Sequence, residues 1–214
     1  MMDGWVGKDY EIGLGLLAMH AGDNSNPFQL EFPGIADVPA EDYIALHYEG
    51  SAKKIPEVMK DGFPKLMKSV QDNGLEISGM PFAQYHAFNA IKDFVSCDMV
   101  IPVKSPKPLK GYVVGSHPAC KCLRTVVRGD YSNLELAWHS AIGHLRMVKS
   151  KPVKGAAMME RYISNPHDCK GLDLVTHIDM PIVVGRWSLW DEWQLVIIAH
   201  RFVNPFTISV LPGR

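Results

Sequence analysis

Glu160 is the residue whose neighbours suggest chemistry most clearly. It lies within residues 156–163, a run typical of a β-strand, and because side chains alternate along a strand, Met158, Glu160 and Tyr162 share one face. A carboxylate buried unpaired beside methionine and aromatic groups is unfavourable. A bound cation would offset that cost, and flanking rings would add about 0.5–2 kcal/mol of cation–π attraction. Alternatively, Glu160 faces solvent or pairs with a nearby Arg or Lys, and the strand pattern by itself favours this alternative.

Aromatic side chains elsewhere in the chain could form the walls of such a site. A flat apolar ligand needs two faces to stack against, and methionine offers an adaptable surface. Each candidate taken alone is more typical of a hydrophobic core, so the prediction depends on the group. His47 could carry a proton, although a strand histidine is more commonly structural. Besides Glu160, the candidate ligand-binding residues are Trp138, Tyr131, Tyr85, Tyr162, Met59, Met158, Phe82 and His47.

Signals for nucleophilic or metal-assisted catalysis are weak. The sequence has no G-x-S-x-G motif, and no cysteine has an evident basic partner. Cys120 and Cys122 are separated by one residue, which is not the usual spacing of zinc ligands. His139 and His144 lie five positions apart, so one helical face cannot present both well. We therefore expect no catalytic residue, no metal and no cofactor. A hydrolase in which Glu160 acts as general base on water stays an alternative.

Composition and charge narrow the class of protein. The chain has 214 residues, 47% of them hydrophobic, which is enough for a folded core. Its 22 basic and 23 acidic side chains give a net charge of −1, which argues against a protein that grips phosphate backbones. Lys104, Lys107 and Lys110 cluster in a proline-rich stretch typical of a solvated loop. The apolar runs are too short to span a membrane, and no signal-peptide pattern is present. We therefore expect a cytoplasmic protein without direct nucleic-acid or membrane contacts.

Hydrophobic periodicity predicts one order of elements, strand–helix–strand–strand, that occurs twice. Alternating residues predict the strands, and apolar residues at three- and four-residue steps predict the helices. Pro64 predicts a kink or a split of the first helix near Gly62. The predicted strands lie at 43–49, 81–88, 98–103, 120–128, 156–163 and 172–180, and the predicted helices at 51–73 and 134–148.

The two sets of elements match in apolar phase. With a shift of 79 residues, Gly50 aligns with Gly129 and Met59 with Trp138. The sequence therefore predicts an α+β fold of duplicated β-α-β-β units with pseudo-two-fold symmetry. It would have two antiparallel sheets and two main helices around a central cleft, a position that ligands often occupy.

Three segments follow from this organisation. Residues 1–40 are predicted to be an irregular extension, with a short helix at 10–20 and a linker or extended surface chain at 22–39. Residues 41–182 form the core, with repeats at about 41–103 and 119–182. The extension at 183–214 carries Trp187, Trp190 and Trp193 at three-residue spacing. This apolar tail is predicted either to pack on the core or to mediate a homodimer or another partner contact.

The core also carries a family resemblance. It contains the strings YIALHYEG, NGLEISGMPFAQYH and DMVIPV, and later VVRGDYSNLELAWHSAIGHL, MERYISNP and LVTHIDMPI. The most specific pieces are Gly129-x-Tyr131 followed by Trp138, and Glu160-x-Tyr162 leading to Asn165-Pro166. In this order and with these gaps, the chain resembles the GyrI-like effector-binding domain of bacterial transcription activators.

The resemblance implies the duplicated βαββ fold and places Glu160 at the acidic pocket position of the family. It implies binding of hydrophobic, cationic aromatic small molecules in the central cleft, which makes an effector- or drug-binding module the first hypothesis. With the resemblance, the pocket arrangement of Glu160 becomes the favoured one. Some stand-alone relatives are described as hydrolases, so that alternative stays open. No DNA-binding head is recognised in this sequence.

Overall fold

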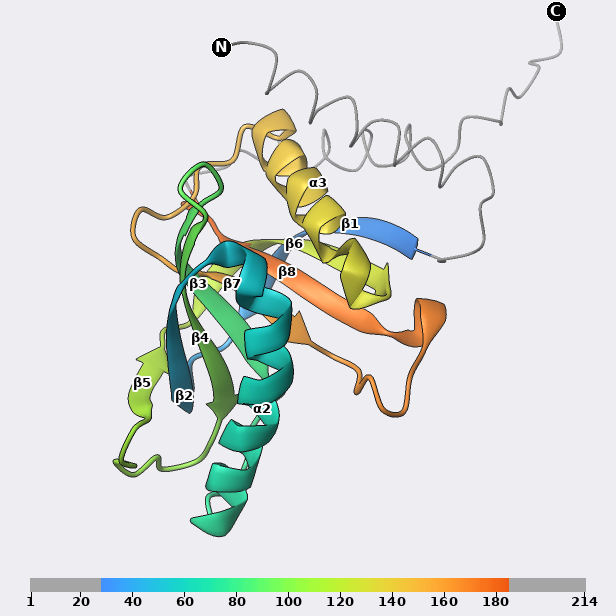
Figure 1. The fold of residues 1–214 in the computed structure, drawn as a ribbon. Coiled ribbons are helices and arrows are strands. Elements are labelled where there is room, and N and C mark those ends of the chain that lie inside the picture. Colours follow the sequence, from blue (N-terminus) through green and yellow to red (C-terminus); the bar gives the residue numbers. More distant parts are fainter. Residues whose placement is uncertain (1–27, 185–214) are drawn as a thin grey trace, which may run out of the picture. The chain divides into compact units, whose positions relative to one another are not determined.

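The computed structural model describes residues 28–184, which form eight strands and two main helices (Figure 1). The predicted helix at 10–20 and the tryptophans of the C-terminal extension lie outside these residues. The strands are β1 (Phe28–Val38), β2 (Glu41–Gly50), β3 (Phe82–Asn89), β4 (Phe94–Pro102), β5 (Val113–His117), β6 (Cys120–Gly129), β7 (Met158–Tyr162) and β8 (Val175–Pro181). The α-helices are α2 (Ile55–Asp72) and α3 (Leu134–Met147), and short 3₁₀ turns lie at Ala52–Lys54, Tyr131–Asn133 and Gly171–Asp173.

All eight strands belong to one antiparallel sheet, in the order β1-β6-β8-β7-β3-β4-β2-β5. The expected α+β class is confirmed, but the prediction of two sheets is wrong. The strands β3 and β7 pair at the centre, with Ala83 opposite Glu160, and this pairing joins the two halves. The order strand–helix–strand–strand occurs at β2–β4 and again at β6–β8. Their origin by duplication, and the pseudo-two-fold symmetry, stay predictions.

The strand β1 corrects the expectation of an irregular chain up to residue 40. Residues 28–38 pair with β6 from Phe28↔Gly129 to Val38↔Cys120, with a register shift between Glu31 and Gly34. Pro33 and Gly34 interrupt the alternation at this irregularity, and Gly34 has a φ of +92°. An edge strand tolerates both residues, because one side of its backbone needs no partner.

The two edges of the sheet lie close together, although they are far apart in strand order. Only Pro39 and Ala40 connect β1 to β2, and only Pro118 and Ala119 connect β5 to β6. Such a link spans at most about 11 Å, so the sheet must curve strongly. One face of the sheet carries a buried cluster of residues from both edges and from the centre: Val38, Tyr43, Ala45, Phe82, Val100, Cys122 and Met159.

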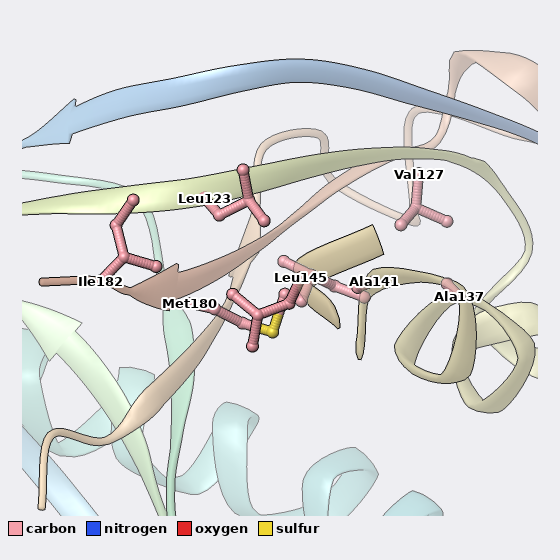
Figure 2. Close-up of a cluster of buried hydrophobic side chains, with 8 residues drawn as sticks. Leu123, Val127, Ala137, Ala141, Leu145, Met180 and Ile182 are labelled. Carbon is pink, nitrogen blue, oxygen red and sulfur yellow. The ribbon is translucent and has the colours of Figure 1, made fainter. Parts of the chain in front are cut away.

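Both helices pack on the other face of the sheet. Helix α2 covers β2 and β4 through a buried cluster that includes Ile44, Leu66 and Met99. Helix α3 covers β6 and β8 through Ala137, Ala141 and Leu145, whose side chains meet those of Leu123, Val127, Met180 and Ile182 (Figure 2). The central strands β3 and β7 lie between these two cores. Among residues 28–184, no helix combines the length and apolar character needed to cross a membrane.

Helix α2 is continuous from Ile55 to Asp72 with Pro64 inside it, so the predicted split does not occur. The close approach of α2 to the sheet explains why residue 62 is glycine. A Cβ at Gly62 would lie 2.2 Å from Sδ and 2.7 Å from Cε of Met99. Met99 is 1% exposed, so its side chain has little space to move.

We expect Gly62→Ala to lower the free energy of unfolding by about 1 kcal/mol, because the strain of overpacking exceeds the gain in helix propensity. Gly143 in α3 is the matched control, because a Cβ there meets no atom within 4 Å. Gly143→Ala should raise stability by up to about 1 kcal/mol. Urea denaturation of both variants measures the difference, and equal effects would contradict the close packing of α2 on β4.

Candidate functional site

Glu160 lies at the centre of the sheet on the face that carries the helices. Its cross-strand partners are Ala83 on β3 and Ile178 on β8. The side chain is 2% exposed, and its Oε2 accepts a hydrogen bond of 2.7 Å from the hydroxyl of Tyr85. Trp138 on α3 is a second hydrogen-bond partner. The carboxylate is thus buried and receives its hydrogen bonds from aromatic side chains rather than from Arg or Lys.

Half-buried aromatic rings surround this carboxylate. Tyr85 and Trp138 meet edge to face with ring centroids 5.6 Å apart, and Tyr131 and Tyr162 are also 5.6 Å apart. Phe63 of α2 contacts Tyr162 at 5.3 Å. The rings come from both helical regions and from both central strands. Together they form an aromatic group over a buried acid, which we call the aromatic cluster: Phe63, Tyr85, Tyr131, Trp138 and Tyr162.

Burial dominates the electrostatics of the site. It raises the pKa of Glu160 to about 7, against the opposing effect of the hydrogen bonds from Tyr85 and Trp138. Burial and the charge of Glu160 also raise the pKa of Tyr131 to about 12 and those of Tyr85 and Tyr162 well above 10.0. The tyrosines are therefore hydrogen-bond donors at neutral pH, and Glu160 is the group that changes charge there.

The structure brings five of the nine candidate residues together, namely Glu160, Tyr85, Tyr131, Trp138 and Tyr162. Met59 packs against the core under α2, and Met158 packs against the core under α3 and pairs with Tyr85 across the β3–β7 ladder. Neither methionine has a contact with the aromatic cluster beyond this strand pairing among the described residues.

Phe82 and His47 lie on the opposite face of the sheet. Phe82 is fully buried, and the guanidinium of Arg161 lies 4.6 Å from the centroid of its ring. His47 is exposed and its Nδ1 lies 2.6 Å from Oδ1 of Asp98. His86 contacts the other oxygen of the same carboxylate at 2.7 Å, and these bonds help to hold the pKa of Asp98 at about 2. The structure therefore does not bring Phe82 or His47 to the aromatic cluster.

Two residues beside Glu160 were not among the candidates. Phe63 lies four residues after the candidate Met59 and so on the same side of the first helix. Cys97 pairs with Tyr85, and burial together with the charges of Asp98 and Glu160 raises its pKa to about 12. Its thiol is therefore protonated at neutral pH. The helical spacing could have found Phe63, whereas Cys97 needs the strand register.

Comparison with known proteins gives matches at the level of structure. No family profile and no curated protein matches the sequence. EcmrR in its complex with DNA aligns with a TM-score of 0.62 and 14% identity, over 81% of this chain and 65% of EcmrR. The aligned part thus spans slightly less than two thirds of the length of EcmrR. The C-terminal domain of EcmrR aligns at 0.57 and 14% identity, over 74% of this chain and 99% of that domain.

A third solved structure is that of SAV2435 bound to tetraphenylphosphonium. It aligns with a TM-score of 0.52 and 11% identity, over 73% of this chain and 93% of SAV2435. These identities establish similarity of fold. The three alignments agree with the expectation from the motifs around Tyr131, Trp138 and Glu160. Residues 28–184 therefore share the fold of the EcmrR C-terminal domain and of SAV2435, as the resemblance to the GyrI-like effector-binding domain leads us to expect.

Proposed function

We propose that this protein binds hydrophobic, cationic aromatic small molecules at the aromatic cluster, with Glu160 as the counter-charge. The observation that carries the proposal is the buried carboxylate of Glu160, whose hydrogen-bond partners are Tyr85 and Trp138 and not a basic side chain. A buried acid without a protein cation is costly in its charged form. A ligand cation supplies the missing charge, and the half-buried rings supply apolar and cation–π contacts.

The hydrogen bonds define the kind of cation that suits this site. Oε2 of Glu160 already accepts from Tyr85 at 2.7 Å, and Trp138 also bonds to the carboxylate. A ligand that stacks on the rings can therefore compensate the charge without donating a hydrogen bond of its own. SAV2435, which has a similar fold, is seen with such a cation, tetraphenylphosphonium, and this supports the proposal.

Two further expectations belong to the proposal. The ligand would bind between the two β-α-β-β units, in a central cleft that opens as the rings of the aromatic cluster separate. For the apolar extension at 183–214 two alternatives stay open, packing on the same chain and a homodimer. The hydrolase alternative would need a reactive substrate beside Glu160, and no contact in the described residues favours it over binding.

A titration with tetraphenylphosphonium tests the proposal. The cation should quench tryptophan fluorescence and bind with saturable heat in calorimetry. Tetraphenylborate is the matched control, because it has the same shape and the opposite charge. We expect it to bind at least about 10-fold more weakly, since a like charge beside a buried carboxylate is unfavourable. Equal binding of both ions, or of neither, would overturn the proposal.

The pH dependence of the same titration follows from Glu160. Its pKa of about 7 means that the carboxylate is largely charged at pH 8 and largely neutral at pH 5. The charge of tetraphenylphosphonium does not depend on pH. If the charged form of Glu160 is the form that binds, affinity should fall about 50-fold between pH 7, where half of the carboxylate is charged, and pH 5. An affinity that is constant over this range would show that Glu160 does not supply the counter-charge.

A further inference from the structure

A pair of thiols lies at the corner where the two edges of the sheet meet. Cys120 and Cys122 are neighbours on one face of β6, and their sulfur atoms are 3.4 Å apart. Cys122 is buried in the cluster that contains Val38, Tyr43 and Phe82, and Cys120 packs against that cluster. Both thiols are free. They lie on the face opposite to the aromatic cluster and have no part in the proposed binding of cations there.

Cys120 gives this pair access to solvent. It is half-buried and lines an open depression of about 460 Å³ together with Asp37, Val38, Pro39, Ala119 and Lys121. Lys121 is paired with Asp37 at 2.7 Å, so the rim of the depression is balanced in charge. Deeper in the pair, burial raises the pKa of the Cys122 thiol, and the neighbouring Cys120 and the charge of Asp179 raise it further against a smaller opposing effect of Arg124. A ligand that enters at Cys120 therefore meets a second, less polar sulfur behind it.

The spacing of the sulfurs fits a bridging ion better than a disulfide. Alternate residues of a strand are about 6.6 Å apart, so the two side chains already lean toward each other. A disulfide would need the sulfurs at about 2.05 Å, which would draw β6 together while it is paired with β1 and β8. With metal–sulfur bonds of about 2.3 Å, sulfurs 3.4 Å apart subtend about 95° at the metal. Opening that angle relaxes the side chains.

The number of ligands selects the kind of ion. Within residues 28–184, no group of three or more His, Cys, Asp or Glu side chains is arranged to hold a metal. Structural zinc sites need four protein ligands. Two thiolates without further protein ligands suit a soft cation of low coordination number, for which Cu(I) is the first-row example. We propose that Cys120 and Cys122 form a two-thiolate binding site for a soft cation of the Cu(I) type. Binding releases the thiol protons to solvent and involves no redox step.

The test uses the reduced full-length protein under anaerobic conditions. Cu(I) is supplied as its coloured complex with bathocuproine disulfonate, and transfer to the protein is followed as loss of that colour and as near-ultraviolet thiolate-to-copper absorption. We expect one Cu(I) per chain. Cys120→Ser should weaken retention by more than about 100-fold, because it removes one of two ligands. Cys169→Ser, which leaves the pair intact, is the matched control and should retain copper as the wild type does.

Three outcomes would overturn the site. These are an absence of copper transfer, equal retention by Cys120→Ser and the wild type, or Zn²⁺ retention as tight as that of Cu(I). A protein that takes up no copper but loses 2 Da on treatment with hydrogen peroxide, with a link mapped to residues 120–122, would show a disulfide pair instead. Cys120 is half-buried, so its serine variant is expected to fold, and circular dichroism of each variant checks this.

Discussion

Replacing Glu160 with glutamine is expected to make the ligand-free protein more stable at pH 8 and to weaken its binding of tetraphenylphosphonium at least 10-fold. The two effects have one cause. Burial raises the pKa of Glu160 from 4.5 to about 7, so the folded state disfavours the charged carboxylate. That difference corresponds to roughly 3 kcal/mol of lost stability above pH 7. Glutamine removes this cost together with the charge that attracts the ligand.

The sign of the pH dependence follows from the same shift. The pKa of Glu160 is higher in the folded state than in the unfolded state, so this group favours folding most below about pH 4.5 and progressively less up to about pH 7. In the wild type, its contribution to the free energy of unfolding falls across that window and is constant above it. Glu160→Gln should lack this decline.

Urea denaturation at pH 5 and pH 8 measures both proteins. Glu57→Gln is the control, because Glu57 is exposed in the first turn of α2 and should change stability by less than about 1 kcal/mol. If the Glu160→Gln variant is less stable than the wild type at pH 8, the inference that the charged Glu160 is buried without a basic partner is wrong. A variant that keeps full affinity for the cation would remove Glu160 from the binding site.

Loss of Asp179 should have the largest effect on stability. Its side chain is fully buried on the face opposite the helices and accepts two hydrogen bonds of 2.7 Å from Arg124. Nε of Arg161 lies 3.6 Å from the same carboxylate, and Arg161 also contacts Glu41 at 2.6 Å. Asp179→Ala leaves two largely buried guanidinium groups without this partner. We expect a loss of about 3–5 kcal/mol in the free energy of unfolding.

The control for this variant is an exposed ion pair of similar length. Lys121 and Asp37 are 2.7 Å apart with both side chains well exposed, so Lys121→Ala should change stability by less than about 1 kcal/mol. Chemical denaturation measures both variants. If Asp179→Ala does not fold, Asp179→Asn keeps the shape and should show a smaller loss in the same direction. A loss below 1 kcal/mol for Asp179→Ala would show that the arginines find other partners.

The helices and the strands β2 to β4 and β6 to β8 were predictable because their apolar residues recur with a clear period. The burial of Glu160 was not predictable from period alone. In β7, Met159 and Arg161 are buried as well as Glu160, so both faces of this central strand are covered. The alternation of residue types along β7 therefore does not show which side chains are exposed to solvent. The family resemblance favoured the pocket arrangement, and the register with Ala83 places Glu160 on the helix face.

Register also explains why Phe82 was grouped with the site. Ala83 pairs with Glu160 and shares its face of the sheet, whereas the preceding residue, Phe82, pairs with Arg161 on the opposite face. A shift of one residue in the register would exchange the two faces. The sequence shows the alternation within each strand but not how the phases of two strands correspond. The same holds for His47, which lies opposite Asp98. Candidate residues on different strands can therefore be grouped only once the pairing is known.

The short links at Pro39–Ala40 and Pro118–Ala119 have a consequence for how the molecule can be divided. From β1 at one edge of the sheet, the chain crosses to build β2 to β5 and then crosses back to build β6 to β8. The half of the sheet under α3 is thus assembled from two separate stretches of sequence. Cutting the chain between β5 and β6 would leave β1 attached to the fragment that does not contain its partner. The half under α3 is therefore not a continuous unit that can be excised, and a fragment that keeps it complete must begin at β1 rather than at β2.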